Sequence, residues 1–201
     1  NIMSVQNIKA IFKLATPQEI KDGIAWYLEA NTLSKEIATK NNISHRTVTG
    51  VIAALSPTNK WNHNVRNAAE LVNAFINGDA MESVKVSTYP KMKEKAWSIL
   101  KDMLDSHDEI RSRLNGDKII PFYECIEGMD SCCIDGHAYN IWEGNRRNMQ
   151  DVPSIGKKLR KEIVSDYVQA ASETIVNGRP LKAYEMQAIT WVTWRRIHGI
   201  V

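Results

Sequence analysis

Two residues with complementary chemistry stand near the middle of the chain, each at the expected start of a helix. Lys118 closes a Gly-x-Lys turn that precedes an apolar helical run, and Asp135 follows an apolar segment and begins another helix. A lysine amine becomes a nucleophile once burial or a neighbouring cation lowers its pKa. An aspartate held by helix N–H groups stays ionised and can accept a proton or stabilise a cationic transition state. The same spacing also fits a surface lysine and an ordinary helix cap, and both interpretations stay open at this point.

A second pattern lies in residues 34–55 and is typical of a helix-turn-helix. Ser34 and Ser44 are candidate caps of two short helices, and the second helix would begin with His45, Arg46 and Thr47. In a sequence-reading DNA-binding protein, such a second helix lies in the major groove. The pattern also fits a packed helical pair, which the uninterrupted continuation of the second helix into an apolar run favours.

The polar stretch over residues 55–64 combines hydrogen-bonding side chains with one large aromatic ring. Ser56, Trp61 and Asn64 could line a pocket or lie beside a base. The alternative is a capped helix junction in which Trp61 belongs to the core. A pocket and a junction are both compatible with the residues alone.

Basic residues form several clusters, although the formal net charge is only +3. Lys157, Lys158 and Arg160 follow a glycine at an expected helix start, where backbone N–H groups can bind a DNA phosphate. Arg146 and Arg147 form a further cluster. A solvated helix face is the alternative for each cluster, but their number favours a surface that binds a polyanion.

Apolar residues recur at helical spacing along almost the whole chain, and alternation with a period of two is nearly absent. Capping residues, prolines and glycines predict helices over 5–14, 17–30, 35–40, 45–55, 61–76, 90–104, 109–114, 119–126, 156–176 and 183–198, with one more from Asp135 onward. The expected caps include a Thr16-to-Glu19 capping box, Ser106 and Ser154.

These elements predict an all-α fold in one domain over residues 1–201. A division into two helical lobes, about 1–105 and 106–201, on either side of a central cleft is compatible with this expectation. The segment at 84–86 is expected to be a short extended piece, and Asn177-Gly178 is expected to form a turn.

The composition and the distribution of apolar residues and cysteines limit the classes of protein to which the chain can belong. No apolar run approaches the roughly 18 residues needed to span a bilayer, and the N-terminus lacks the pattern of a signal peptide. We therefore expect a soluble cytoplasmic protein that does not bind membranes. Cys125, Cys132 and Cys133 are too few for a four-thiolate iron–sulfur cluster and form no disulfide framework. No metal and no cofactor are expected.

The layout of Lys118 and Asp135 resembles the helix-hairpin-helix DNA glycosylase superfamily, which has the endonuclease III-like fold. Members carry a Gly-x-Lys hairpin followed by a Val-Asp-x-His segment, and the counterparts here begin at Gly116 and Ile134. More closely, about residues 45–197 resemble a group of phage-encoded proteins distantly related to those glycosylases. Four motifs in matching order carry this likeness: Ala54–Asn64, Gly116–Tyr123, Asp135–Ala138 and Gln187–Trp191.

The resemblance implies a helix-hairpin-helix glycosylase-like fold and a base flipped out of double-stranded DNA as the substrate, because the reacting atom is hidden in the base stack. It implies Asp135 as the main catalytic carboxylate. It implies Lys118 as the amine nucleophile of a lyase-type step, or as a lysine that binds phosphate. Five residues would line the substrate pocket: Ser56, Trp61, Asn64, His137 and Tyr139. A glycine and five basic residues would hold the DNA: Gly116, Arg146, Arg147, Lys157, Lys158 and Arg160.

Taken together, residues and resemblance predict a cofactor-free, monomeric hydrolase that cleaves the N-glycosidic bond of a pyrimidine in DNA, modified pyrimidines included. If the chain is phage-encoded, the host cytoplasm is its expected location. Two other hypotheses stay open. One is an enzyme that remodels the substituent of a modified pyrimidine and leaves the glycosidic bond intact. The other is a non-catalytic helix-turn-helix protein, which predicts exposed His45, Arg46 and Thr47, whereas the glycosylase hypothesis predicts a buried helix over 44–55.

Overall fold

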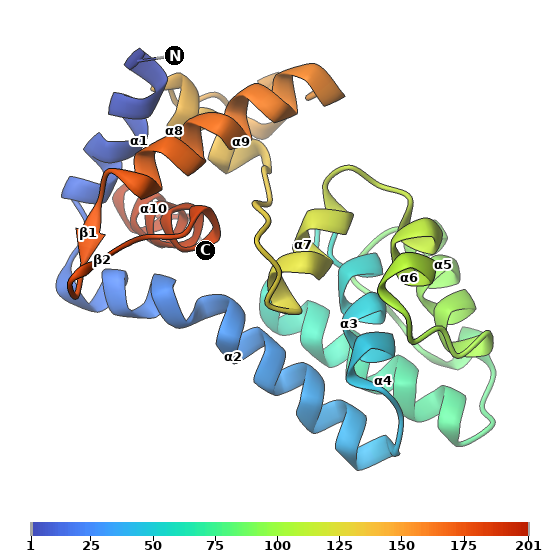
Figure 1. Cartoon of the computed structure of the whole chain (residues 1–201). Coiled ribbons are helices and arrows are strands. Elements are labelled where there is room, and N and C mark those ends of the chain that lie inside the picture. Colours follow the sequence, from blue (N-terminus) through green and yellow to red (C-terminus); the bar gives the residue numbers. More distant parts are fainter. Residues whose placement is uncertain (1, 201) are drawn as a thin grey trace. The chain divides into compact units, whose positions relative to one another are not determined.

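The computed structural model describes residues 2–200, which form a predominantly helical protein with ten α-helices and one minimal hairpin. These residues divide into two compact units. Unit 1 combines 2–27 with 130–200, and unit 2 is Leu28–Met129. A long helix, α2 (Pro17–Asn41), contributes to both units. The all-α fold class predicted from the sequence is confirmed (Figure 1).

Unit 1 contains α1 (Ile2–Lys13), the first part of α2, α8 (Gly136–Glu143), α9 (Lys157–Ser172) and α10 (Ala183–His198). A 3-10 helix, η2 (Met149–Asp151), precedes α9, and an antiparallel hairpin of β1 (Ile175–Val176) and β2 (Arg179–Pro180) joins α9 to α10. Helix α1 packs against α8, α9 and α10. Their buried apolar side chains, including Ile8, Ile163, Tyr167 and Ile189, form one core.

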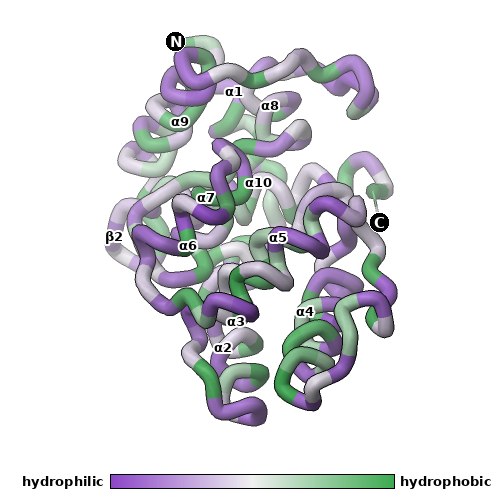
Figure 2. Tube along the Cα trace, turned by 90° about the vertical axis from the view of Figure 1, so that its right-hand side faces the viewer, coloured by the Kyte–Doolittle hydropathy of each residue, from purple (hydrophilic) through white to green (hydrophobic). Residues whose placement is uncertain are grey.

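Unit 2 contains the remainder of α2, α3 (His45–Ala54), α4 (Trp61–Ile76), η1 (Met81–Ser83), α5 (Pro90–Lys101), α6 (His107–Leu114) and α7 (Ile119–Ile126). Helix α3 is central and packs against α4, α5, α6 and α7. Gly50 permits this crowding, because a Cβ there would lie 3.0 Å from Cγ2 of Ile110. Figure 2 shows hydrophobic and hydrophilic residues interspersed along the helices of the molecule, as expected for amphipathic helices.

Several helix starts predicted from local sequence are confirmed. The backbone N–H of Glu19 donates to Thr16 Oγ1 at 3.1 Å, and Thr16 N–H donates to Glu19 Oε1 at 3.0 Å, which is the expected capping box. Ser44 caps α3 and Ser106 caps α6 through their side-chain oxygens. These signals are reliable because the capping contacts span at most three residues.

The expected break before residue 35 is wrong, because α2 runs without interruption from Pro17 to Asn41. Ser34 is not a cap but a buried residue inside the helix. Its hydroxyl bonds the carbonyl oxygen of His45 at 3.1 Å and the hydroxyl of Thr49 at 2.7 Å. A serine in mid-helix can satisfy its hydroxyl on a neighbouring helix, and the sequence does not reveal that neighbour.

The exposed recognition helix of the helix-turn-helix hypothesis is absent from the described residues, since Thr47 to Ala54 are all buried. Thr47 donates its hydroxyl to the carbonyl oxygen of Leu104 at 2.7 Å. His45 is half-buried and bonded to the carboxylate of Glu127, and only Arg46 is exposed. Helix α3 therefore lies in the core of unit 2, and the glycosylase hypothesis likewise predicts a buried helix here.

Other boundaries also differ from the expectation. The helix expected over 156–176 starts after the backbone cap Gly156, not after Ser154, and ends at Ser172. The chain then forms the β1–β2 hairpin, whose turn Asn177-Gly178 has positive φ at both residues and confirms the predicted turn.

The helix expected over 90–104 ends at Lys101, and Met103 has a positive φ. The segment 84–86 forms no strand and follows the 3-10 turn η1 instead. Runs of apolar residues cannot by themselves place a helix end, because the capping geometry that ends the helix lies in the backbone.

The two units also differ from the lobes considered at about 1–105 and 106–201. The division falls at Leu28 and Asp130 because α1 packs on α8, α9 and α10, so the first helix belongs with the last three. Sequence order alone does not indicate that the two ends of the chain share a core.

Candidate functional site

Asp135 lies at the start of α8 in unit 1, and its carboxylate caps that helix. Oδ1 accepts the backbone N–H of Ala138 at 2.8 Å. Within the described part of the chain, the second oxygen, Oδ2, accepts no hydrogen bond, and the side chain is only half-buried. A helix N-terminus stabilises a negative charge. The helix therefore holds the carboxylate through Oδ1 and leaves Oδ2 available to a ligand.

The backbone that leads to Asp135 is buried and irregular. Cys132, Cys133 and Ile134 are buried and belong to no helix or strand. A buried carbonyl needs a donor, and for Ile134 this is the guanidinium of Arg160, whose Nη1 donates at 2.8 Å. Burial raises the pKa of the Cys132 thiol, and the neighbouring Cys133 and Asp135 add to that shift. Cys132 is thus a neutral core residue beside the carboxylate.

Helix α8 carries two other predicted pocket residues. His137 is half-buried, and its Nδ1 is buried without a hydrogen-bond partner among the described residues. Tyr139 is buried, with its ring 5.6 Å from that of Trp142. Burial and the nearby Glu143 carboxylate raise the pKa of Tyr139. His137 therefore keeps an unused hydrogen-bonding nitrogen, whereas Tyr139 serves the packing of α8.

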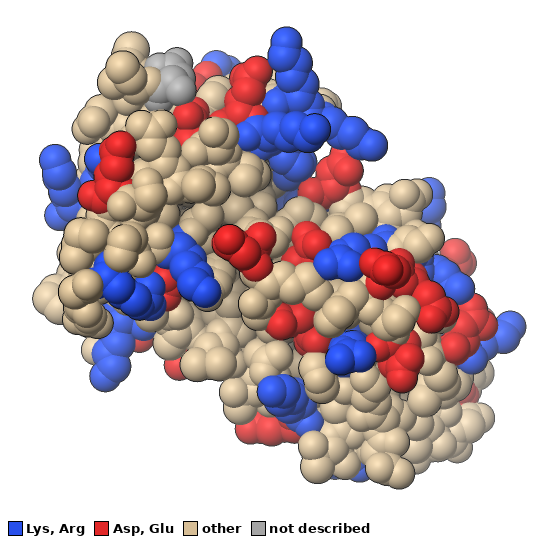
Figure 3. All heavy atoms as spheres, in the orientation of Figure 1, with Lys and Arg blue, Asp and Glu red and all other residues tan. Residues whose placement is uncertain are grey.

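The first turns of α9 carry a group of exposed lysines: Lys157, Lys158 and Lys161. The cap residue Gly156 has no side chain to bond the first N–H groups of the helix. Figure 3 shows Lys and Arg side chains gathered over this N-terminal end of α9. Free N–H groups and exposed ammonium groups together favour phosphate. Arg160 lies on the same turns but is bonded to Ile134, so its environment differs from that of the lysines.

Of the two arginines after α8, Arg147 forms an ion pair and Arg146 is exposed. Arg147 donates through Nε and Nη2 to both carboxylate oxygens of Glu143, each at 2.7 Å. This ion pair lowers the pKa of Glu143 and raises that of Arg147. Arg146 is exposed, and its charge adds to burial in lowering the pKa of His198. Arg146 is thus the better placed of the two for an anionic ligand.

Lys118 and Gly116 lie in unit 2, in the tight connection between α6 and α7. Asn115 ends α6 in the left-handed conformation, and Lys118 is the exposed cap residue of α7. A Cβ at Gly116 would lie 2.9 Å from Cγ1 of Ile119, so the turn requires glycine. The structure therefore has the expected two helices with a short Gly-x-Lys turn, and it assigns Lys118 and Asp135 to different units.

The remaining predicted pocket residues also lie in unit 2. Ser56 donates its hydroxyl to the carbonyl oxygen of Ala53 at 2.7 Å, which is a helix-end contact. Trp61 begins α4, and its ring meets that of Phe122 edge-on at 6.1 Å. Asn64 is only 1% exposed, and its Oδ1 has no hydrogen-bond partner within the described residues. Asn64 is therefore a buried polar group with unused bonding capacity.

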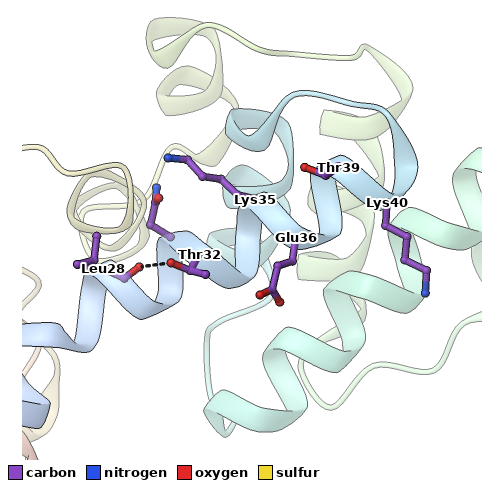
Figure 4. Close-up of a pocket in the computed structure, with 7 residues that line it drawn as sticks. Leu28, Thr32, Lys35, Glu36, Thr39 and Lys40 are labelled. Carbon is purple, nitrogen blue, oxygen red and sulfur yellow. Dashed lines mark hydrogen bonds between the residues drawn. The ribbon is translucent and has the colours of Figure 1, made fainter.

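Unit 2 also has a shallow, open hollow along one face of α2, drawn in Figure 4. It is lined by Leu28, Asn31, Thr32, Lys35, Glu36, Thr39 and Lys40. Most of these side chains are exposed, and none was predicted to act on a substrate. The hollow belongs to the surface of a helix and does not coincide with Asp135.

Two further features are absent from the part of the chain that the structure describes. No group of three or more His, Cys, Asp or Glu side chains is arranged to hold a metal ion. No helix over 2–200 combines the length and apolar character needed to cross a membrane.

Two contacts near Asp135 differ from what the sequence predicts. Arg160 is expected to bind DNA together with Lys157 and Lys158, but its guanidinium bonds the Ile134 carbonyl oxygen, and its neighbours in the sequence do not indicate this partner. Met149 of η2 packs on Gly136, where a Cβ would lie 2.8 Å from the Met149 sulfur. A glycine in the first turn of a helix, between Asp135 and His137, was a usable signal for such a close approach.

Comparison with known families gives one match. The model of the family of unknown function DUF7178 matches residues 2–198, which is nearly the whole chain. The chain therefore belongs to this family. No curated protein and no solved structure matches it.

Proposed function

We propose that this member of the DUF7178 family acts on a base in DNA and that Asp135 is its central carboxylate. One observation carries the proposal: a helix-held carboxylate with a free oxygen lies in the same unit as an exposed lysine cluster on α9. The Gly-x-Lys turn and the Asp-x-His segment at helix starts, together with the buried α3, agree with the glycosylase resemblance.

The preferred reaction is hydrolysis of the N-glycosidic bond. The bond between C1′ and the base nitrogen breaks, and its electron pair leaves with the base, which takes up a proton. Oδ2 of Asp135 stabilises the positive charge that develops on the sugar and accepts a proton from the water that attacks C1′. Electrostatic stabilisation of a developing charge is commonly the largest single contribution to catalysis.

DNA binding would rest on the exposed cations of unit 1. Lys157, Lys158 and Lys161 extend from the first turns of α9, where the unpaired helix N–H groups also attract phosphate. Contacts of this kind fix the position of the duplex without reading its sequence. The target base must leave the stack to reach a carboxylate, as in other enzymes that act on bases.

The unused Nδ1 of His137 is a candidate hydrogen-bonding group for the substrate, since it lies two residues after Asp135. Lys118 is a candidate amine nucleophile for a lyase-type step. The proposal for Asp135 does not depend on Lys118.

The decisive experiment incubates the protein with DNA that contains normal or modified pyrimidines. Released bases and intact nucleosides are then identified by mass spectrometry, with borohydride present in a parallel sample to trap amine adducts. Asp135→Asn is the matched variant, because asparagine also caps helices and removes only the charge. We expect free base with the wild-type protein and a loss of about 100-fold or more in Asp135→Asn.

Other outcomes separate the remaining hypotheses. A trapped adduct that disappears in Lys118→Ala would add lyase chemistry. A nucleoside of altered mass without free base would replace hydrolysis by remodelling of the base substituent. Tight duplex binding with no product from any substrate would contradict an enzymatic role.

A further inference from the structure

The long side chain of Arg160 supports the backbone immediately before Asp135. Residues 132–134 are buried and belong to no helix or strand, so their peptide groups must be satisfied by other parts of the protein. The carbonyl oxygen of Ile134 accepts its hydrogen bond from Nη1 of Arg160 at 2.8 Å. The peptide bond is planar, so a fixed Ile134 oxygen also fixes the nitrogen and Cα of Asp135.

Arg160 is oriented differently from the cations around it. Its Nε is buried and has no partner among the described residues, which places the guanidinium stem inside the protein. Lys157, Lys158 and Lys161 are exposed on the same turns of α9. A guanidinium that bonds an internal carbonyl has fewer donors left for a DNA phosphate.

Asp135 is constrained on its other side as well. Its Oδ1 is held by the Ala138 N–H, and the next residue, Gly136, lies against the sulfur of Met149. The carboxylate is therefore held through its own side chain and through the preceding peptide, and Met149 packs on the residue that follows. The hydrogen bond to the preceding peptide comes from Arg160, a residue of another helix, α9.

We infer that Arg160 is a positioning residue for Asp135 and not a ligand of DNA phosphate, an inference that rests on the proposed role of Asp135. Arg160 orients the Ile134–Asp135 peptide, and this orientation aims Oδ2 at the substrate. Arg160 itself does not touch the substrate. The exposed lysines of α9 carry the phosphate contacts instead.

The test compares Arg160→Gln with Lys161→Gln, which removes the same charge from the adjacent, exposed position. Hydrogen exchange of the Ala138 amide, followed by NMR, reports on the Asp135 cap and requires no activity. We expect Arg160→Gln to accelerate this exchange at least about tenfold, because a hydrogen bond from a charged group is lost. Lys161→Gln should leave it unchanged.

Single-turnover base release and DNA affinity are measured on the same variants. Arg160→Gln should slow base release by up to about 100-fold while affinity and its salt dependence stay close to wild type. Lys161→Gln should weaken binding and lower the slope of log affinity against log salt by about 1, with the rate at saturation retained. Arg160→Lys, which keeps one donor, should recover part of the rate, and it replaces the glutamine variant if that protein does not fold.

Failure of this inference differs from failure of the proposed function. Unchanged Ala138 exchange in Arg160→Gln would overturn the positioning role, whatever the activity. A loss of affinity and salt dependence equal to that of Lys161→Gln would make Arg160 a phosphate ligand. Accelerated exchange in a protein that releases no base would keep the positioning role and reject the glycosylase.

Discussion

The two carboxylate oxygens of Asp135 have different roles. Oδ1 accepts the Ala138 N–H and starts α8, and Oδ2 is left without a hydrogen bond from the described residues. The capping task needs only an oxygen acceptor, whereas the proposed chemistry needs a negative charge. Substitutions at this residue can therefore separate folding from function.

The capping task gives a prediction about stability. Asp135→Ala should lower the free energy of unfolding by about 1 kcal/mol, and Asp135→Asn by less than about 0.5 kcal/mol, because asparagine caps helices as well as aspartate does. Urea denaturation followed by circular dichroism measures both values. Equal stability of the alanine and asparagine variants would contradict the capping role.

At the scale of elements, the capping residue Glu19 of α2 also binds a residue of α10, which is distant in the sequence. Glu19 forms the expected capping box with Thr16 at the start of α2. Its carboxylate also accepts two hydrogen bonds from Arg196 near the end of α10, at 2.8 and 3.0 Å. The ion pair and the contact of Gly23 with Ile189 tie these two helices together within unit 1.

This ion pair predicts a pH dependence. The hydrogen bond from Arg196 lowers the pKa of Glu19 below its ordinary value of 4.5. A lowered folded-state pKa means that the pair stabilises unit 1 fully above the unfolded-state pKa and loses this contribution as the pH falls through the folded-state pKa. Glu19→Gln should therefore lower Tm near pH 7 and make little difference near about pH 2.

Thermal melts across that range, followed by circular dichroism, provide the measurement. Glu162→Gln is the control, because Glu162 is an exposed carboxylate on α9. A Tm difference between wild type and Glu19→Gln that persists unchanged at the acid end would show that the ion pair is not its source.

At the scale of the whole molecule, the two units differ in how the chain builds them. Unit 2 is one continuous segment with its own buried core around α3, including Val48, Ile52 and Leu71. Unit 1 requires both ends of the described chain, because α1 packs against α8, α9 and α10. Only unit 2 can therefore complete its core from a continuous fragment.

We expect a fragment of residues 28–129 to fold into a helical unit with a cooperative thermal transition. A fragment of 130–200 should show no such transition until a peptide of residues 2–27 is added, because the core side chains Val5 and Ile8 come from α1. Circular dichroism melts of the fragments, separately and mixed, test this. A cooperative melt of 130–200 alone would show that α1 is dispensable.

Much of the secondary structure could be predicted from the sequence, because its signals are local. The caps Ser44 and Ser106 and the final helix Ala183–His198 all appear as expected. A cap bonds an N–H group two or three residues away, so the residues that decide a helix start are neighbours in the sequence. Asp135 follows this rule, whereas Lys118 makes no side-chain cap and its place at a helix start follows from the Gly-x-Lys turn before it.

The tertiary structure decided everything that depends on which distant segments meet. Ser34 lies inside one long helix because its hydroxyl is satisfied on α3, and α3 is core because four helices pack around it. Arg160 is half-buried and bonded to Ile134, a residue of another segment, whereas Lys157 and Lys158 are exposed. Burial and long-range hydrogen bonds are properties of the packed chain, so basic residues from one short stretch of the sequence can have different roles.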